Sequence, residues 1–198
     1  MGIVLGSLFP DLDNYAVAAA TLAGLDTHGL HRSFTHSLFT MLAAIAVFFV
    51  IAQARQQPRW TTLGLGFATG IGLHIALDLL IWFNGVTLLW PLDTWVNLWE
   101  GIKPPEWLAK LLDPAELLFF ALFFIWLARA ARERRTNIDF LGKLRLWTIA
   151  MLVLLAIFTP LAYLMSKGFL TIFGLAYLVS LTAAFLITIR MRQTVEAS

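Results

Sequence analysis

Long apolar stretches separated by short polar segments dominate this chain of 198 residues. A helix crosses the hydrocarbon core of a bilayer with about 20 predominantly apolar residues. We predict a membrane-spanning helix in each long stretch, with approximate bounds 37–54, 61–83, 115–128, 146–165 and 169–189. The pattern therefore predicts an all-α fold, a polytopic membrane helix bundle of about five transmembrane helices.

Three other segments do not fit a complete span. Residues 1–9 and 14–25 are apolar runs of the length that is typical of re-entrant, packed or interfacial helices. Residues 1–9 also lack the basic start of a signal peptide. Residues 84–114 contain four Trp and four Pro, and tryptophan concentrates at membrane interfaces. We predict short N-terminal helices and an amphipathic, Trp-rich interfacial segment between the second and third spans.

The second span has a face of small residues, formed by Gly64, Gly66, Gly70 and Gly72. Small residues let a neighbouring helix approach closely in a membrane. We therefore expect this face to pack against another helix rather than to take part in chemistry.

Composition supports a membrane protein. The chain is 60% hydrophobic and 13% charged, whereas soluble domains are about 45–50% apolar and about 25% charged. We interpret it as one integral membrane domain over 1–198, with a motif-bearing part, 1–116, and C-terminal spans, 117–198. It contains no cysteine, which excludes disulfides and thiolate metal sites.

The basic residues are distributed unevenly between the two sides of the predicted bundle. Ten of the 14 lie in the 55–60 loop, the 129–145 loop and the C-terminus, and four lie on the other side. The positive-inside rule makes the first side cytoplasmic, so the C-terminus is predicted to be cytoplasmic and the N-terminal motifs to face outward. This clustering indicates membrane topology rather than nucleic-acid binding.

His74 and Asp78 are ionisable residues inside the second span, four positions apart and thus on one face of a helix. Such residues are costly at membrane depth and usually face a partner, a cavity or a metal. At about 1.5 Å per residue, they lie toward the outer boundary of the bilayer. His36, Asp11 and Asp13 are predicted to lie at the same level, so these residues can converge on one site.

Histidine and carboxylate ligands suit a divalent cation such as zinc, manganese or iron. His74 and Asp78 provide two ligands, and Asp11 or Asp13 with His31 or His36 can complete the set. A metal with an open position can activate water near neutral pH. Arg32, beside His31, is placed to hold a phosphate.

Several alternatives remain open on the residues alone. His74 can simply bond a neighbouring helix, Asp11 and Asp13 can be cap and turn residues, and Arg32 can be an interfacial anchor. A non-catalytic transporter or regulatory protein would use the His and Asp residues as an ion or proton site. Against a transporter, the sequence shows no pair of related halves.

Four motifs in order resemble the YdjM-like family of inner-membrane proteins, which are described as metal-dependent hydrolases. They are Pro10-Asp11-Leu12-Asp13, His31-Arg32-Ser33-Phe34-Thr35-His36-Ser37, Gly72-Leu73-His74-Ile75-Ala76-Leu77-Asp78 and the turn that ends in Trp90-Pro91. Glu116 resembles the acidic residue that this family often places after the Trp-Pro turn. Family members usually begin with a longer first helix than residues 1–9.

The family is similar in motif to zinc-dependent phospholipase C and related zinc nucleases. That similarity implies Asp11 or Asp13, then His36, His74 and Asp78 as metal ligands, and hydrolysis of a phosphoester such as a phospholipid. The soluble enzymes carry a further His-x-x-x-Glu pair, whereas this chain has no His after His74.

We therefore predict a membrane-bound hydrolase of the inner membrane. It is predicted to use a divalent metal, with zinc as the first candidate, to activate water at the outer face. The predicted catalytic residues are Asp13, His36 and Arg32. The predicted metal ligands are Asp11, Asp13, His31, His36, His74, Asp78 and Glu116. The predicted partners are membrane lipid and a phosphoester substrate.

Overall fold

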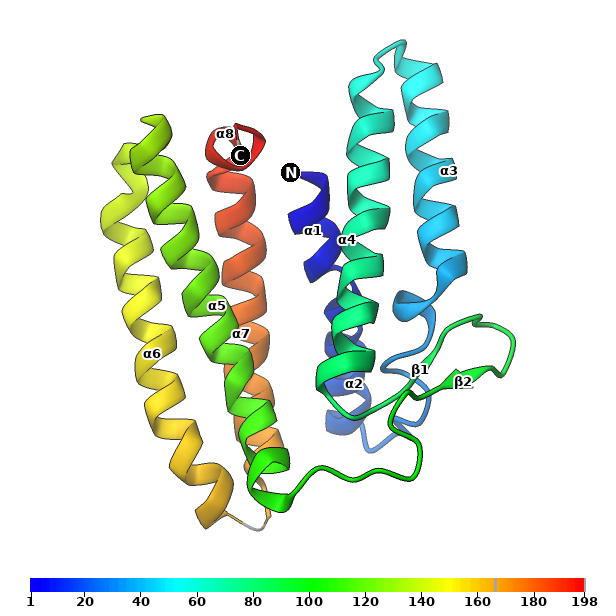
Figure 1. Cartoon of the computed structure of the whole chain (residues 1–198), viewed down its shortest axis with the longest axis vertical. Coiled ribbons are helices and arrows are strands. Elements are labelled where there is room, and N and C mark those ends of the chain that lie inside the picture. Colours follow the sequence, from blue (N-terminus) through cyan, green and yellow to red (C-terminus); the bar gives the residue numbers. More distant parts are fainter. Residues whose placement is uncertain (166, 198) are drawn as a thin grey trace. The chain divides into compact units, whose positions relative to one another are not determined.

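The computed structural model describes residues 1–165 and 167–197, and the chain divides into two compact units, Met1–Lys103 and Pro104–Ser198 (Figure 1). All four motifs lie in the first unit. Its elements in chain order are α1 (Gly2–Leu8), η1 (Pro10–Leu12), α2 (Asp13–Leu22), η2 (Phe34–His36), α3 (Leu38–Arg55), α4 (Arg59–Ile81), β1 (Val86–Thr87) and β2 (Trp95–Val96).

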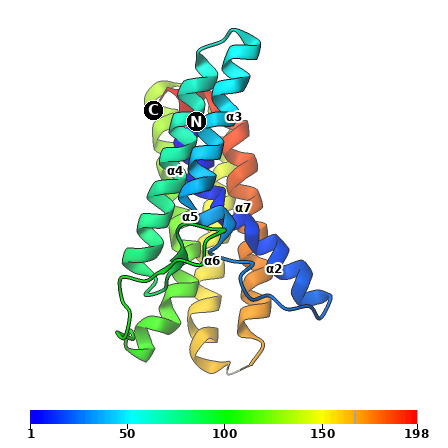
Figure 2. The same ribbon diagram turned by 90° about the vertical axis from the view of Figure 1, so that its right-hand side faces the viewer.

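The first unit is built on the hairpin of α3 and α4, which run side by side in Figures 1 and 2. Gln56 ends α3 in a left-handed conformation, and Pro58 precedes α4, so the connection turns sharply. Basic residues Arg55 and Arg59 flank that turn, whereas the motif residues lie at the opposite end of the hairpin.

Helix α1 packs backbone to backbone on α4, through glycines on both helices. A Cβ atom at Gly6 would lie 2.0 Å from the carbonyl oxygen of Phe67, and one at Gly70 would lie 2.2 Å from that of Ile3. No other residue fits at this distance. Two glycines of the predicted small-residue face, Gly66 and Gly70, therefore receive α1, whereas Gly64 and Gly72 meet side chains of α3. The packing brings the end of α1 close to His74.

The strands β1 and β2 form a short antiparallel hairpin with Val86 opposite Val96. Val86 is fully buried against Ile71 and Ile75 of α4. The hairpin also holds the histidine motif: the N–H of Thr87 donates to the carbonyl oxygen of Arg32 (2.8 Å). The interfacial segment thus forms part of the support for the site.

Ser37 joins this hairpin to the start of α3. Its hydroxyl oxygen accepts from the N–H of Phe39 (3.2 Å) and its O–H lies 3.2 Å and 3.1 Å from the carbonyl oxygens of Leu88 and Trp90. The residue is fully buried. It therefore serves both as the helix N-cap and as a tether for the hairpin.

We expect Ser37→Ala to lower the free energy of unfolding by about 1–2 kcal/mol, because the cap and the tether are both lost. Thermal unfolding in detergent measures this. Thr69→Ala is the matched control, since the exposed Thr69 hydroxyl bonds only Leu65 of its own helix and should change stability by less than about 0.5 kcal/mol. Equal losses in the two variants would contradict the double role of Ser37.

The second unit contains α5 (Glu106–Arg134), η3 (Ile138–Phe140), α6 (Leu141–Leu164), α7 (Phe169–Arg190) and α8 (Arg192–Glu196). Its core includes the fully buried Phe124, Leu144 and Leu181 from three different helices. Asn137, in a left-handed conformation, accepts from the backbone N–H of Thr194 (3.2 Å) and from its hydroxyl (3.0 Å), which fixes α8.

The five predicted spans are confirmed as helices long and apolar enough to cross a membrane: Leu38–Arg55, Arg59–Ile81, Glu106–Arg134, Ile138–Leu164 and Phe169–Arg190. Three predicted boundaries are wrong. Residues 106–114 belong to α5 rather than to the interfacial segment, and 129–134 and 141–145 are helical rather than loop. Pro114 costs α5 a backbone hydrogen bond, but it is buried inside the helix, so packing offsets the local breaker.

Candidate metal centre

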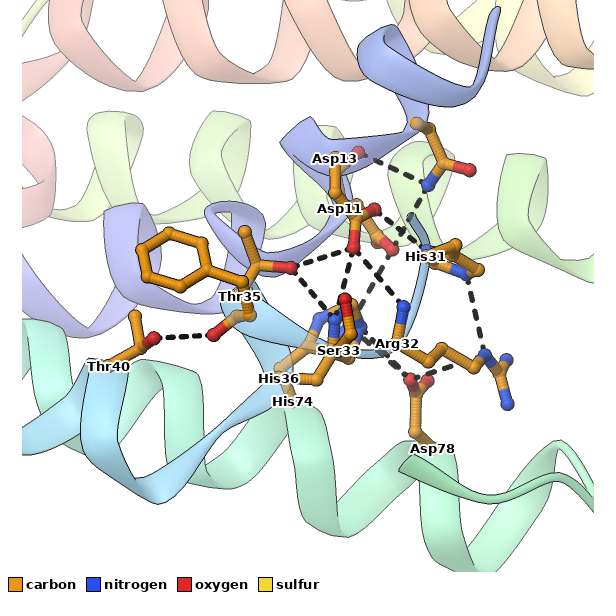
Figure 3. A network of polar contacts seen from close by, with 12 residues as sticks. Asp11, Asp13, His31, Arg32, Ser33, Thr35, His36, Thr40, His74 and Asp78 are labelled. Atoms are coloured by element: carbon orange, nitrogen blue, oxygen red, sulfur yellow. Dashed lines mark hydrogen bonds and ion pairs between the residues drawn. The ribbon is translucent and has the colours of Figure 1, made fainter. Parts of the chain in front are cut away.

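Seven ionisable residues of the first unit lie together where the motifs meet (Figure 3). They come from η1, the first residue of α2, the segment before α3, and α4: Asp11, Asp13, His31, Arg32, His36, His74 and Asp78. Residues separated by more than 60 positions in the sequence thus lie in one site. This agrees with the prediction that they lie at the same level and can converge.

The inner group of this cluster consists of Asp11, His36, His74 and Asp78. Nε2 of His36 lies 3.3 Å from Oδ2 of Asp78, and Nε2 of His74 lies 3.7 Å from the same oxygen. Nε2 of His74 also lies 3.7 Å from Oδ1 of Asp11. Asp11, His36 and His74 each place one potential ligand atom within 4.8 Å of the other two, and Asp78 lies beside both histidines.

Three atoms of the inner group are buried without a hydrogen-bond partner among the residues that the structure describes. They are Nε2 of His36, Nε2 of His74 and Oδ2 of Asp78. Each unsatisfied buried polar atom costs about 1–3 kcal/mol, so such atoms are uncommon and rarely gather at one point. A cation bound between them would satisfy all three.

The opposite ring nitrogens of both histidines have protein partners. Nδ1 of His74 lies 2.8 Å from the carbonyl oxygen of Ser7, which can only accept. Nδ1 of His36 lies 3.0 Å from the Thr35 hydroxyl and 3.4 Å from Oδ2 of Asp13. A metal-ligating histidine typically donates its other N–H to a carbonyl or carboxylate. This arrangement directs the Nε2 lone pairs toward the inner group.

Asp13 holds the surrounding segment in place. Its carboxylate lies 2.7 Å from Nδ1 of His31 and accepts from the Thr35 hydroxyl (2.7 Å) and the backbone N–H of Arg32 (3.3 Å). Burial by itself would raise the pKa of Asp13, but the hydrogen bonds and positive charge of His31 and His36 hold that pKa well below its usual range. Asp13 is therefore ionised at neutral pH.

The same carboxylates act on His36. Burial by itself would lower the pKa of His36, but the neighbouring carboxylates of Asp13 and Asp78 raise it to about 9. A histidine must lose its proton from the ligating nitrogen to bind a metal. A cation that binds Nε2 of His36 therefore displaces a proton from it.

Arg32 lies beside the inner group in a left-handed backbone conformation with φ of 62°. This conformation is uncommon for a residue other than glycine and is often found at functional sites. Its Nε lies 3.9 Å from Oδ2 of Asp78 and 3.4 Å from Nε2 of His31. Nη1 is buried and has no hydrogen-bond partner within the described part of the chain, so it is available to an anion.

The comparison with family models decides the relationship of the chain. The model of the YdjM inner membrane protein family matches residues 1–165. The chain belongs to the YdjM inner membrane protein family. No curated protein and no solved structure gives a match. The predicted resemblance is thus confirmed, and the match includes the whole ionisable cluster.

In this YdjM family protein, Glu116 lies on α5 in the second unit, whereas the seven clustered residues belong to the first. Its role as a ligand stays a prediction. His28 lies in the exposed loop after α2, where its backbone N–H donates to Asp26, consistent with a loop residue.

Two further contributors were not among the predicted site residues: the Thr35 hydroxyl and the Ser7 carbonyl oxygen. Thr35 directly precedes His36, so its position in the motif offered a signal. Ser7 offered none, because a backbone carbonyl has no sequence signature and reaches His74 only through the packing of α1 on α4.

Proposed function

We propose that this membrane protein is a metal-dependent hydrolase that cleaves a phosphoester. Its divalent cation, with zinc as the first candidate, would be held by Asp11, His36, His74 and Asp78. The observation that carries the proposal is the group of three buried atoms on His36, His74 and Asp78 that make no hydrogen bond to the described residues, although they lie only 3.3–3.7 Å apart. A purely structural cluster would be expected to bring these atoms into hydrogen bonds.

The spacing of the donor atoms fits a small cation. Ligand atoms about 2.0–2.2 Å from a tetrahedral zinc lie about 3.3–3.6 Å from each other. Three donor pairs of the inner group, His36–Asp78, His74–Asp78 and His74–Asp11, are 3.3–3.7 Å apart. The mixture of two imidazoles and two carboxylates also suits zinc and excludes metals that need thiolates. When bound, such a cation polarises a phosphoryl oxygen and makes water acidic enough to attack near neutral pH.

The chain's own residues would bind and orient the substrate. The guanidinium of Arg32 presents Nη1 beside the inner group, and a guanidinium can donate two parallel hydrogen bonds to a phosphate. Asp13 would keep Arg32 in this position, because it accepts from the Arg32 backbone N–H. A phosphoryl group held by Arg32 would therefore lie next to the metal ligands.

We also propose that the substrate reaches the site from the outer leaflet. The site lies at the end of the α3–α4 hairpin opposite Arg55 and Arg59, which the positive-inside rule places in the cytoplasm. The half-exposed rings of Phe34 and Trp90 pack edge to face at 5.1 Å beside this end. An apolar rim next to a polar centre suits a phospholipid or another amphiphilic phosphoester.

The test is hydrolysis of bis(p-nitrophenyl) phosphate by the purified chain in detergent. We expect activity that a chelator lowers by at least about 100-fold and that added zinc restores, because the bound cation would activate the attacking water. His28→Ala, a histidine outside the cluster, should keep wild-type activity. A chain that binds zinc, hydrolyses no phosphoester or phospholipid, and moves an ion across liposomes would contradict the proposal and support the ion-site alternative.

A further inference from the structure

His31 differs from the other two histidines of the cluster in its exposure. Its side chain is 32% exposed, whereas those of His36 and His74 are 0% and 13% exposed. Its ring packs edge to face on the ring of His36, with centroids 5.2 Å apart. His31 therefore lies at the solvent-facing side of the centre, where a substrate would approach.

The bond between His31 and Asp13 differs in kind from the contacts of the inner group. Nδ1 of His31 lies 2.7 Å from Oδ1 of Asp13, a short, charge-assisted hydrogen bond. Two ligands of one zinc lie farther apart, at about 3.3 Å. Asp13, His31 and His36 are close enough to form a second potential metal group. However, the Asp13–His31 pair already shares a proton where a cation would have to enter.

The other nitrogen of His31 points toward the proposed phosphate binder. Nε2 of His31 accepts from Nε of Arg32 at 3.4 Å, so Nδ1 carries the hydrogen toward Asp13. A carboxylate that fixes one imidazole nitrogen and leaves the other to face the substrate is the arrangement of a general acid–base histidine. A phosphate oxygen that accepts hydrogen bonds from the Arg32 guanidinium would replace Nε2 of His31 as its acceptor. Nε2 would then be free to face the substrate.

We propose that His31 is the proton donor to the leaving group, oriented by Asp13, and not a metal ligand; this inference rests on the proposed phosphoester hydrolysis. The attacking water loses a proton to solvent, its oxygen bonds to phosphorus, and the bond from phosphorus to the leaving oxygen breaks. Once the phosphate has taken the place of Nε2 as the acceptor of Arg32, Nε2 of His31 takes a proton from solvent and gives it to that oxygen. The products are a phosphate and an alcohol, and the protein is unchanged.

The first arm of the test is metal content. We expect His31→Ala to retain zinc within about twofold of wild type, whereas His74→Ala loses it, since outer partners affect affinity far less than ligands do. His31→Gln is the second variant, because its amide N–H can replace the donor to Asp13 and preserve the fold. Loss of zinc from a folded His31 variant would overturn the proposal in favour of a ligand role.

The second arm compares leaving groups in the same variants. A nitrophenolate leaves without a proton, whereas an alkoxide needs one. We therefore expect kcat for an alkyl phosphodiester to fall about 10²–10⁴-fold in His31→Ala, against less than about tenfold for the nitrophenyl ester. Equal losses on both substrates would overturn the proposal. If wild type binds zinc but hydrolyses neither ester, the proposed function fails and this inference fails with it, regardless of the metal content of the variants.

Discussion

Replacing His74 by alanine is expected to reduce the zinc bound per chain to less than about a tenth of the wild-type value, because a ligand is removed rather than an outer partner. Nε2 of His74 faces both Asp78 and Asp11, at 3.7 Å from an oxygen of each. Without it, the remaining donors include two negatively charged carboxylates and one imidazole. Elemental analysis of detergent-purified protein after dialysis measures the change.

The matched control for this experiment is His28→Ala, which removes a histidine from an exposed loop of the same unit. It should leave the zinc content unchanged. The zinc content of Asp13→Asn should fall between those of His28→Ala and His74→Ala. We expect its zinc affinity to be about 10–100-fold lower than that of wild type, because Asp13 supports His36 and His31 from outside the inner group. Equal zinc in wild type and His74→Ala would reject the metal centre.

Gly70→Ala is expected to destabilise the first unit and to weaken the metal centre at the same time. The new Cβ would lie 2.2 Å from the carbonyl oxygen of Ile3 and 2.7 Å from the backbone nitrogen of Ser7. Backbone atoms cannot yield as a flexible side chain can, so α1 must move away from α4. We expect a loss of about 1–3 kcal/mol in the free energy of unfolding.

The displacement of α1 would also act on the site. It would pull the Ser7 carbonyl oxygen away from Nδ1 of His74, now 2.8 Å away, and would carry the following Asp11 with it. Zinc affinity should therefore fall by about 10–100-fold. Thermal unfolding and zinc titration in detergent measure the two effects.

Gly174→Ala is the matched control, because Gly174 lies within α7 and a Cβ there meets nothing within 4 Å. That variant should be neutral, or more stable by up to about 1 kcal/mol, since alanine favours a helix more than glycine does. If Gly70→Ala proved as stable as wild type with the same zinc affinity, the close packing of α1 would not position the centre.

The sequence by itself determined which segments form spans and which residues lie level with one another. Hydropathy and helical spacing are local properties, so α3, α4 and the one-turn spacing of His74 and Asp78 could be predicted from residues close together in the chain. The start of α5 could not, because burial outweighed the helix-breaking effect of Pro114.

Only the tertiary structure decided which partner each clustered side chain contacts. Asp11 and Asp13 are two residues apart, and no local rule distinguishes them. In the folded unit, Asp11 faces His74, whereas Asp13 bonds His31 and Thr35. The orientation of each imidazole likewise depends on Ser7, Thr35 and Asp13. Most of these contacts join segments that are distant in sequence, and the one between Ser7 and His74 exists only once α1 has packed on α4.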